Sequence, residues 1–133
     1  MHYGIQLDAQ CKPIGQSPLF AYWRMKEKGA SVTEQLLSRE QAGYGLGPQS
    51  VELTENGAHV KFIVRALSER PILLDVQKTE AGCTATPWIV IGDGTAKLFN
   101  IHVNVSWPFG IGSVVMTGYK KADGSVVREK IAK

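Results

Sequence analysis

Three histidines are the side chains of this sequence best suited to acid–base chemistry or metal binding. His2, His59 and His102 stand on separate segments, and none has a second histidine at the four-residue spacing of a helical zinc motif. Nucleophilic catalysis needs a serine or cysteine held by a base, and no serine lies in a Gly-x-Ser-x-Gly context. We therefore expect no catalytic residues, no metal site and no cofactor.

His102 is the histidine with the most suggestive neighbours. Asn100, Asn104 and Ser106 share its face of an alternating segment, and this row of donors and acceptors could line a polar groove. The commoner explanation for such a row is the solvated side of a sheet. We keep His102 as a candidate ligand-binding residue. An enzyme would need His102 to face a cleft beside an aspartate or glutamate.

The segment Tyr22-Trp23-Arg24 combines aromatic and basic side chains on one alternating stretch. Arg24 offers a planar fork for a carboxylate or phosphate, and Tyr22 offers amphipathic contact area. Together with Glu40 and Tyr44, these two residues form our candidate surface for a protein or small-molecule ligand. The competing explanation is an ion pair between Arg24 and Glu40 that pins a helix to the sheet.

Two cysteines, Cys11 and Cys83, are the only ones in the chain, and neither belongs to a Cys-x-x-Cys motif. Cys11 lies in a loop rich in turn formers, and Cys83 opens a later alternating segment. The two could form a disulfide across one end of a sheet, contributing up to roughly 4 kcal/mol. Such a bond would indicate an oxidising compartment. The alternative is two unrelated small buried residues.

The elements that position these residues are predicted to be mainly β-strands, because apolar and polar residues alternate along most of the chain. Asn56-Gly57 predicts the tight turn of a hairpin. Pro87 predicts an edge or bulged strand. The strands are expected at 3–7, 19–26, 51–53, 60–66, 72–77, 83–91, 94–107, 114–119 and 125–131.

One segment departs from this pattern. Ser38-Arg39-Glu40-Gln41 matches a capping box, so a short helix is expected from Ser38 to Tyr44. Gly45 is expected to end that helix in a left-handed conformation.

Length and composition favour one domain over residues 1–133, since 133 residues with 44% hydrophobic side chains can bury a single core. The expected fold is mostly β, an antiparallel β-sandwich or barrel of about eight to nine strands with one short helix. Phe62, Trp88, Phe99 and Trp107 are expected to point inward, which indicates a filled centre.

Charge and hydropathy exclude two classes of partner. The formal net charge of +3 is scattered rather than gathered into a stripe, which indicates no nucleic-acid binding. No apolar run approaches the roughly twenty residues that span a bilayer, so we expect no membrane span.

A family resemblance rests on Tyr22-Trp23-Arg24-Met25, then on Leu37-Ser38-x-x-Gln41-x-x-Tyr44-Gly45-Leu46, and finally on a closing Gly118-Tyr119 with Asp123-Gly124. With these motifs the chain resembles, over nearly its whole length, an uncharacterised family of secreted bacterial proteins, domain-of-unknown-function family 4833. The resemblance implies a secreted or periplasmic location, with the export leader absent from this chain, and it implies no activity. The family usually has a further opening segment, so a missing first strand and a homodimer through the exposed edge strand are expected.

Three functions follow from these observations. The leading hypothesis is a noncatalytic binding or protein-interaction module that acts outside the cytoplasm. The alternative is a lipocalin-like carrier of a small apolar ligand, which requires an unfilled cavity. The third is a hydrolase that uses His102.

Overall fold

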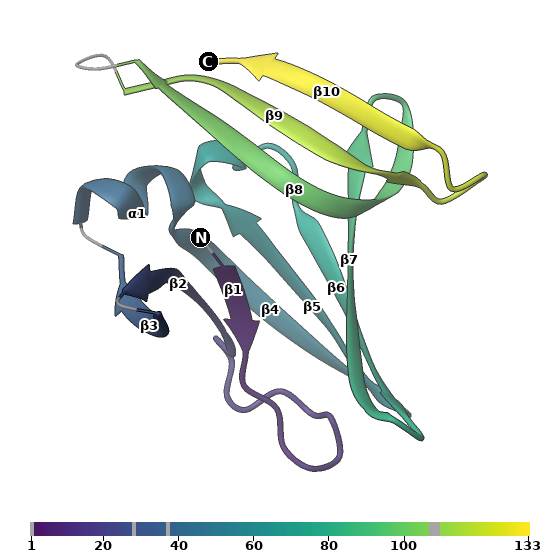
Figure 1. Cartoon of the computed structure of the whole chain (residues 1–133). Helices are drawn as coiled ribbons and strands as arrows, with labels where there is room; N and C mark the ends of the chain where they lie inside the picture. Colours follow the sequence, from purple (N-terminus) through teal and green to yellow (C-terminus); the bar gives the residue numbers. More distant parts are fainter. Residues whose placement is uncertain (1, 28, 37, 107–109) are drawn as a thin grey trace.

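The computed structural model describes residues 2–27, 29–36, 38–106 and 110–133. In this part of the chain, ten antiparallel strands form two sheets, with strand orders β1-β2-β3 and β10-β9-β8-β7-β6-β5-β4 (Figure 1). The elements are β1 (His2–Ile5), β2 (Leu19–Glu27), β3 (Ala30–Gln35), α1 (Ser38–Tyr44), β4 (Leu46–Thr54), β5 (Gly57–Val64), the 3-10 turn η1 (Arg65–Leu67), β6 (Ile72–Thr79), β7 (Gly82–Ile91), β8 (Gly94–Ser106), β9 (Gly110–Lys120) and β10 (Val126–Ala132).

The predicted fold class is confirmed, since the protein is mostly antiparallel β with one short helix at Ser38–Tyr44. Of the two architectures expected, the barrel does not form, because β10 and β4 are the outer strands of an open sheet. The strand that sequence reasoning missed is β3. Its only partly buried side chain is Val32, so it has almost no apolar face for a periodic pattern to reveal.

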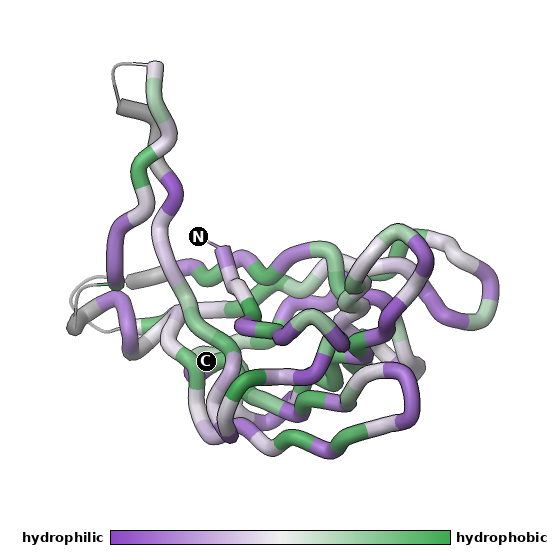
Figure 2. Tube along the Cα trace, turned by 90° about the horizontal axis from the view of Figure 1, so that it is seen from below, coloured by the Kyte–Doolittle hydropathy of each residue, from purple (hydrophilic) through white to green (hydrophobic). Residues whose placement is uncertain are grey.

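The larger sheet bends sharply, so that β8, β9 and β10 lie above β4, β5 and β6 (Figure 1). The core lies on the concave side, where alternate residues of β5 and β6 are buried. β1 runs along this concave side and pairs with β2, and the β2–β3 hairpin projects from the rest of the molecule (Figure 2).

The bend coincides with a separation of β7 from β8. The two strands pair only between Trp88–Ile91 and Gly94–Lys97. The first half of β7 therefore pairs with β6 alone, and Pro87 lies there, where a missing N–H breaks no ladder on the open side. The edge character predicted from Pro87 holds for this half, although β7 is an inner strand of the sheet.

Two glycine predictions need correction, although the elements themselves are as expected. The β4–β5 hairpin turns at Glu55-Asn56, one residue early, and a Cβ on Gly57 would lie 1.9 Å from the Val76 carbonyl oxygen. Gly45 does follow α1 but has no positive φ. A Cβ there would lie 2.3 Å from the carbonyl oxygen of Gln41, so close approach explains that glycine. The capping side chain of Ser38 lies outside the described residues.

The prediction that four large aromatic residues point inward is only partly correct. Phe62 is buried and Trp88 is half-buried, whereas Phe99 is 65% exposed. A bulge between Leu98 and Asn100 shifts the register of β8 and turns Phe99 out of the core face. Trp107 lies outside the described residues.

The predicted disulfide is confirmed. Cys11 and Cys83 are bonded, with their Cα atoms 5.6 Å apart, and they join the β1–β2 loop to the start of β7. Within the described residues, no helix has the length and apolar character needed to cross a membrane.

Candidate functional site

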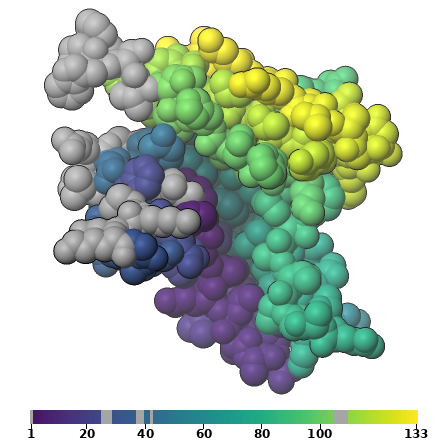
Figure 3. Space-filling model, viewed as in Figure 1, coloured from purple at the N-terminus to yellow at the C-terminus, as the bar shows by residue number. Residues whose placement is uncertain are grey.

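A pocket of about 420 Å³ lies between β1 and the concave face of the larger sheet. Figure 3 shows the surface recess between purple β1 and green β8. Its lining comes from six strands and the end of α1: His2, Tyr3, Gly4, Ile5, Leu19, Tyr44, Phe62, Val64, Ile72, Leu74, Ala85, Pro87, Leu98, Phe99, Asn100 and Ile101.

The floor of the pocket is part of the hydrophobic core. Phe62 and Val64 of β5 and Ile72 and Leu74 of β6 are all buried. Their period-two spacing places them on one face of the sheet, and Phe62 is paired with Ile72 in register. The floor is therefore continuous and apolar.

The mouth of the pocket lies where β7 and β8 separate. Ala85 and Pro87 contribute from the unpaired half of β7, and residues 98–101 contribute from the bulged part of β8. Because the bulge turns Phe99 outward, its large side chain does not occupy the space between β1 and the larger sheet. Phe99 therefore does not fill the interior, contrary to the prediction made for the four large aromatic residues.

The polar groups of the pocket are few and uncharged apart from the titratable His2. The Tyr3 hydroxyl donates a hydrogen bond to the Tyr44 carbonyl oxygen at 2.8 Å. Burial of the phenol, and secondarily its proximity to Tyr44, raises the pKa of Tyr3 to about 12. A site with this lining can hold an apolar body and orient it through one or two neutral hydrogen bonds.

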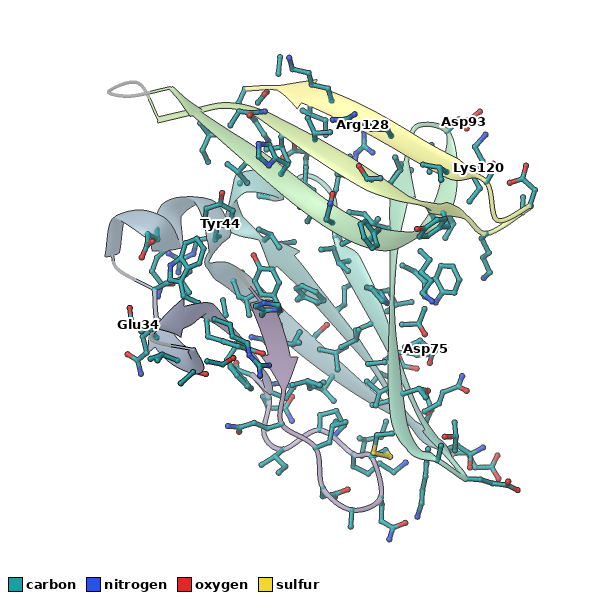
Figure 4. The ribbon with its side chains drawn as sticks, in the orientation of Figure 1. Glu34, Tyr44, Asp75, Asp93, Lys120 and Arg128 are labelled. Carbon is teal, nitrogen blue, oxygen red and sulfur yellow. A yellow bond between two sulfur atoms is a disulfide. The ribbon has the colours of Figure 1, made fainter. Side chains whose placement is uncertain are left out.

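Two of the predicted site residues, Glu40 and Tyr44, come together, but the residue of β2 that they contact is Trp23 rather than Arg24. Trp23 Nε1 donates to the carboxylate of Glu40 at 2.8 Å, and the Trp23 and Tyr44 rings meet edge to face with centroids 6.1 Å apart. Tyr44 also lines the pocket, at the end of α1 beside β1 (Figure 4). This contact fixes α1 against β2.

The other two residues of the predicted surface lie on the opposite side of β2. Successive strand residues alternate faces, so Tyr22 and Arg24 point away from Trp23. Tyr22 packs against His2 with ring centroids 5.7 Å apart, and Arg24 is exposed. Among the ion pairs between described residues, none joins Arg24 to Glu40.

His102 lies apart from the pocket on the solvent-facing side of β8. Its Nε2 is 3.1 Å from the Asn104 side-chain oxygen, and the side chain of Ser106 lies outside the described residues. The histidine that contacts a carboxylate, within the described ranges, is His59, at 3.5 Å from Asp75.

A second hollow, of about 460 Å³, lies between the β7–β8 and β9–β10 turns. Asp93 and Lys120 lie close together there (Figure 4). The nearby Asp123 is held by Ser125, whose N–H and hydroxyl both donate to it. No group of three or more metal-ligating side chains occurs in the part of the chain that the structure describes.

Sequence reasoning missed the pocket residues Tyr3, Ile5 and Asn100. The alternation of Tyr3 and Ile5 predicted a strand, and that strand is present as β1. Nothing local in the sequence states that β1 crosses the concave face of another sheet. The only sequence signal for this pocket was the row of neutral polar residues that includes Asn100. We interpreted that row as a candidate site around His102.

Comparison with known proteins gives one family. The model of the family described as domain of unknown function (DUF4833) matches residues 1–130, so the chain belongs to that family. No curated protein and no solved structure matches the chain.

Proposed function

We propose that this family member is a noncatalytic binding domain that holds a small apolar ligand in the pocket between β1 and the larger sheet. The observation that carries the proposal is the pocket itself, about 420 Å³ with an apolar floor and few polar groups. Pockets of this size and lining are typical small-molecule sites. Of the functions considered from the sequence, the carrier is the one that requires such a space.

The competing functions have weaker support. A protein-interaction surface made of Tyr22, Arg24, Glu40 and Tyr44 would have to use both sides of β2. A hydrolase that uses His102 would need a nearby carboxylate, and the contact of His102 is an amide oxygen. Unlike a lipocalin, this domain would hold its ligand beneath an open, bent sheet.

A blocking variant tests the proposal. Ala85 is exposed and lines the mouth, so Ala85→Trp should obstruct the pocket without disturbing the core. Thr84 is the matched control, because it is also exposed on β7 but lies on the opposite face. Binding of the neutral fluorescent probe 1-aminonaphthalene should be at least about tenfold weaker for Ala85→Trp and unchanged for Thr84→Trp, since the new indole displaces the probe.

Either of two results would contradict the proposal. The probe could fail to bind the unaltered protein, or the two variants could bind it equally well. Circular dichroism of both variants shows whether the fold is intact and keeps the comparison valid.

The location that we propose is the periplasm or the extracellular space. It is supported by the Cys11–Cys83 bond, because structural disulfides persist in oxidising compartments. Production of the chain with and without an export leader, followed by thiol alkylation, tests this location. We expect both cysteines to resist alkylation in the exported protein, because they are disulfide-bonded there, and to react in the protein made without a leader.

A further inference from the structure

In the part of the chain that the structure describes, the lining of the pocket between β1 and the larger sheet contains no permanently charged side chain. Among the described residues that line it, none is Lys, Arg, Asp or Glu, and the polar ones are His2, Tyr3, Tyr44 and Asn100. An ionised group buried without a counter-charge is strongly disfavoured. The lining therefore selects against ligands that carry a charge into the pocket.

Tyr3 gives a second indication of the same preference. Its hydroxyl hydrogen is committed to the Tyr44 carbonyl oxygen, which leaves the Tyr3 oxygen able to accept a hydrogen bond from a ligand. Tyr3 is 37% exposed, and the buried part of its surroundings raises the pKa of the phenol and so penalises negative charge at this position. A carboxylate placed beside Tyr3 would meet the same penalty.

The backbone at the mouth offers only neutral groups. β7 lacks a β8 partner from Gly82 to Pro87, and β8 lacks a β7 partner beyond Lys97. The edges of these two separating strands present peptide N–H and C=O groups. Such groups can bind an alcohol, an amide or an ester, and they do not neutralise a carboxylate.

The volume sets the size of the apolar part. About 420 Å³ corresponds to about fourteen non-hydrogen atoms, if each takes roughly the 30 Å³ of one water molecule. A single chain of about ten to twelve carbons with a small head group fills this space.

From these observations, and resting on the proposed function, we infer that the ligand is an apolar chain with an uncharged polar head group that can donate a hydrogen bond, such as a medium-chain alcohol or primary amide. Fatty acids of the same length should bind more weakly in their ionised form. The head group lies beside Tyr3, and the chain lies against the floor formed by Phe62, Ile72 and Leu74.

Decanol and decanoate make the test, because they share a chain and differ in the charge of the head group. Each would displace 1-aminonaphthalene from the unaltered protein at about pH 8, where decanoate is ionised. We expect decanol to bind at least about tenfold more tightly than decanoate. Equal affinity, or tighter binding of decanoate, would overturn the inference and leave the proposed function intact. Failure of the probe, decanol and decanoate alike would instead count against the proposed function.

A variant shows whether decanoate binds more weakly than decanol because the pocket lacks a cation. Phe99 lies exposed at the rim, so Phe99→Lys adds a cation there without changing the floor. We expect it to improve decanoate binding about two- to fivefold relative to decanol, because an exposed ion pair contributes little. Val126→Lys is the matched control, since Val126 is equally exposed but does not line the pocket. If Phe99→Lys leaves the ratio of the two affinities unchanged, or Val126→Lys changes it as much, the inference is wrong.

Discussion

Glu129 connects three parts of the chain through its two carboxylate oxygens. Both Arg70 Nη atoms donate to it, at 3.0 and 2.7 Å, and the Gly92 N–H donates at 2.5 Å. Arg70 also donates to the Val90 carbonyl oxygen at 2.7 Å. The side chain thereby ties β10 to the segment before β6 and to the β7–β8 turn. It therefore holds β10, an outer strand of the bent sheet, in place.

Glu129→Gln should therefore destabilise the protein in a pH-dependent way. The hydrogen bonds from Arg70, and then that from Gly92, hold the pKa of Glu129 below its ordinary value of 4.5. Because the folded pKa is lowered, this contribution is present above pH 4.5 and is lost as the pH falls through the lowered pKa. We expect a loss of about 1–3 kcal/mol in the free energy of unfolding near neutral pH.

Urea unfolding at neutral and at acid pH measures this effect. The difference between Glu129→Gln and the unaltered protein should shrink at about pH 3, below the ordinary carboxyl pKa. Glu52→Gln on the exposed face of β4 is the control and should change little at either pH. If the difference in the free energy of unfolding is the same at both pH values, the charge of the Glu129 carboxylate plays no part.

Single residues also show where sequence reasoning succeeds. Glu40 and Tyr44 were predicted to meet β2, and they do. Their partner is Trp23 rather than Arg24, because alternation along the strand puts Arg24 on the other face. The error at Phe99 has a different cause: one bulge inverts the side-chain pattern beyond it, and no local signal in the sequence marks that bulge.

The loop between β1 and β2 is attached to several distant parts of the chain. Cys11 is bonded to Cys83, and the Lys12 ammonium donates to the carbonyl oxygens of Thr54 and Gly57 in the β4–β5 turn. The Lys78 ammonium donates to the Gln10 side chain at 2.7 Å. The loop thus fixes one end of β1, and β1 is a wall of the pocket.

Reduction of the disulfide should lower stability by an amount set by the length of the closed loop. The two cysteines are 72 residues apart, for which the loss of chain entropy in the unfolded state gives about 4 kcal/mol. Urea unfolding with and without a reductant measures the change in the transition midpoint. A Cys11→Ala, Cys83→Ala double variant should be as unstable as the reduced protein and insensitive to the reductant.

No change of midpoint on reduction would contradict this account of the β1–β2 loop. Equal sensitivity of the double variant to the reductant would show that the reagent acts elsewhere.

At the scale of elements, period-two alternation and turn residues predicted nine of the ten strands in the described residues, and a capping box predicted the short helix. These signals are local, because they depend on residues a few positions apart. The separation of β7 from β8 is different in kind. It depends on where a long ladder stops, and Pro87 was the only sequence feature that marked it.

The whole molecule is a bent sheet that a short strand crosses on its concave side, with a space left between the two. The sequence predicted an antiparallel fold and a disulfide but not this space. The arrangement of β1 over β5 and β6 joins residues about sixty to seventy positions apart, and such packing is not encoded in any one segment. The central claim is that this space is a ligand site.

Methyl-resolved NMR of the protein titrated with decanol tests that claim most directly. Ile5, Ile72, Leu74 and Ile101 line the pocket, so their methyl signals should shift together and saturate with one affinity. Leu73 is the internal control, because it neighbours two of these residues but is exposed on the opposite face of β6. Shifts at Leu74 without shifts at Leu73 would support the pocket. Shifts confined to Leu73 and other exposed methyls, or no shifts at all, would contradict it.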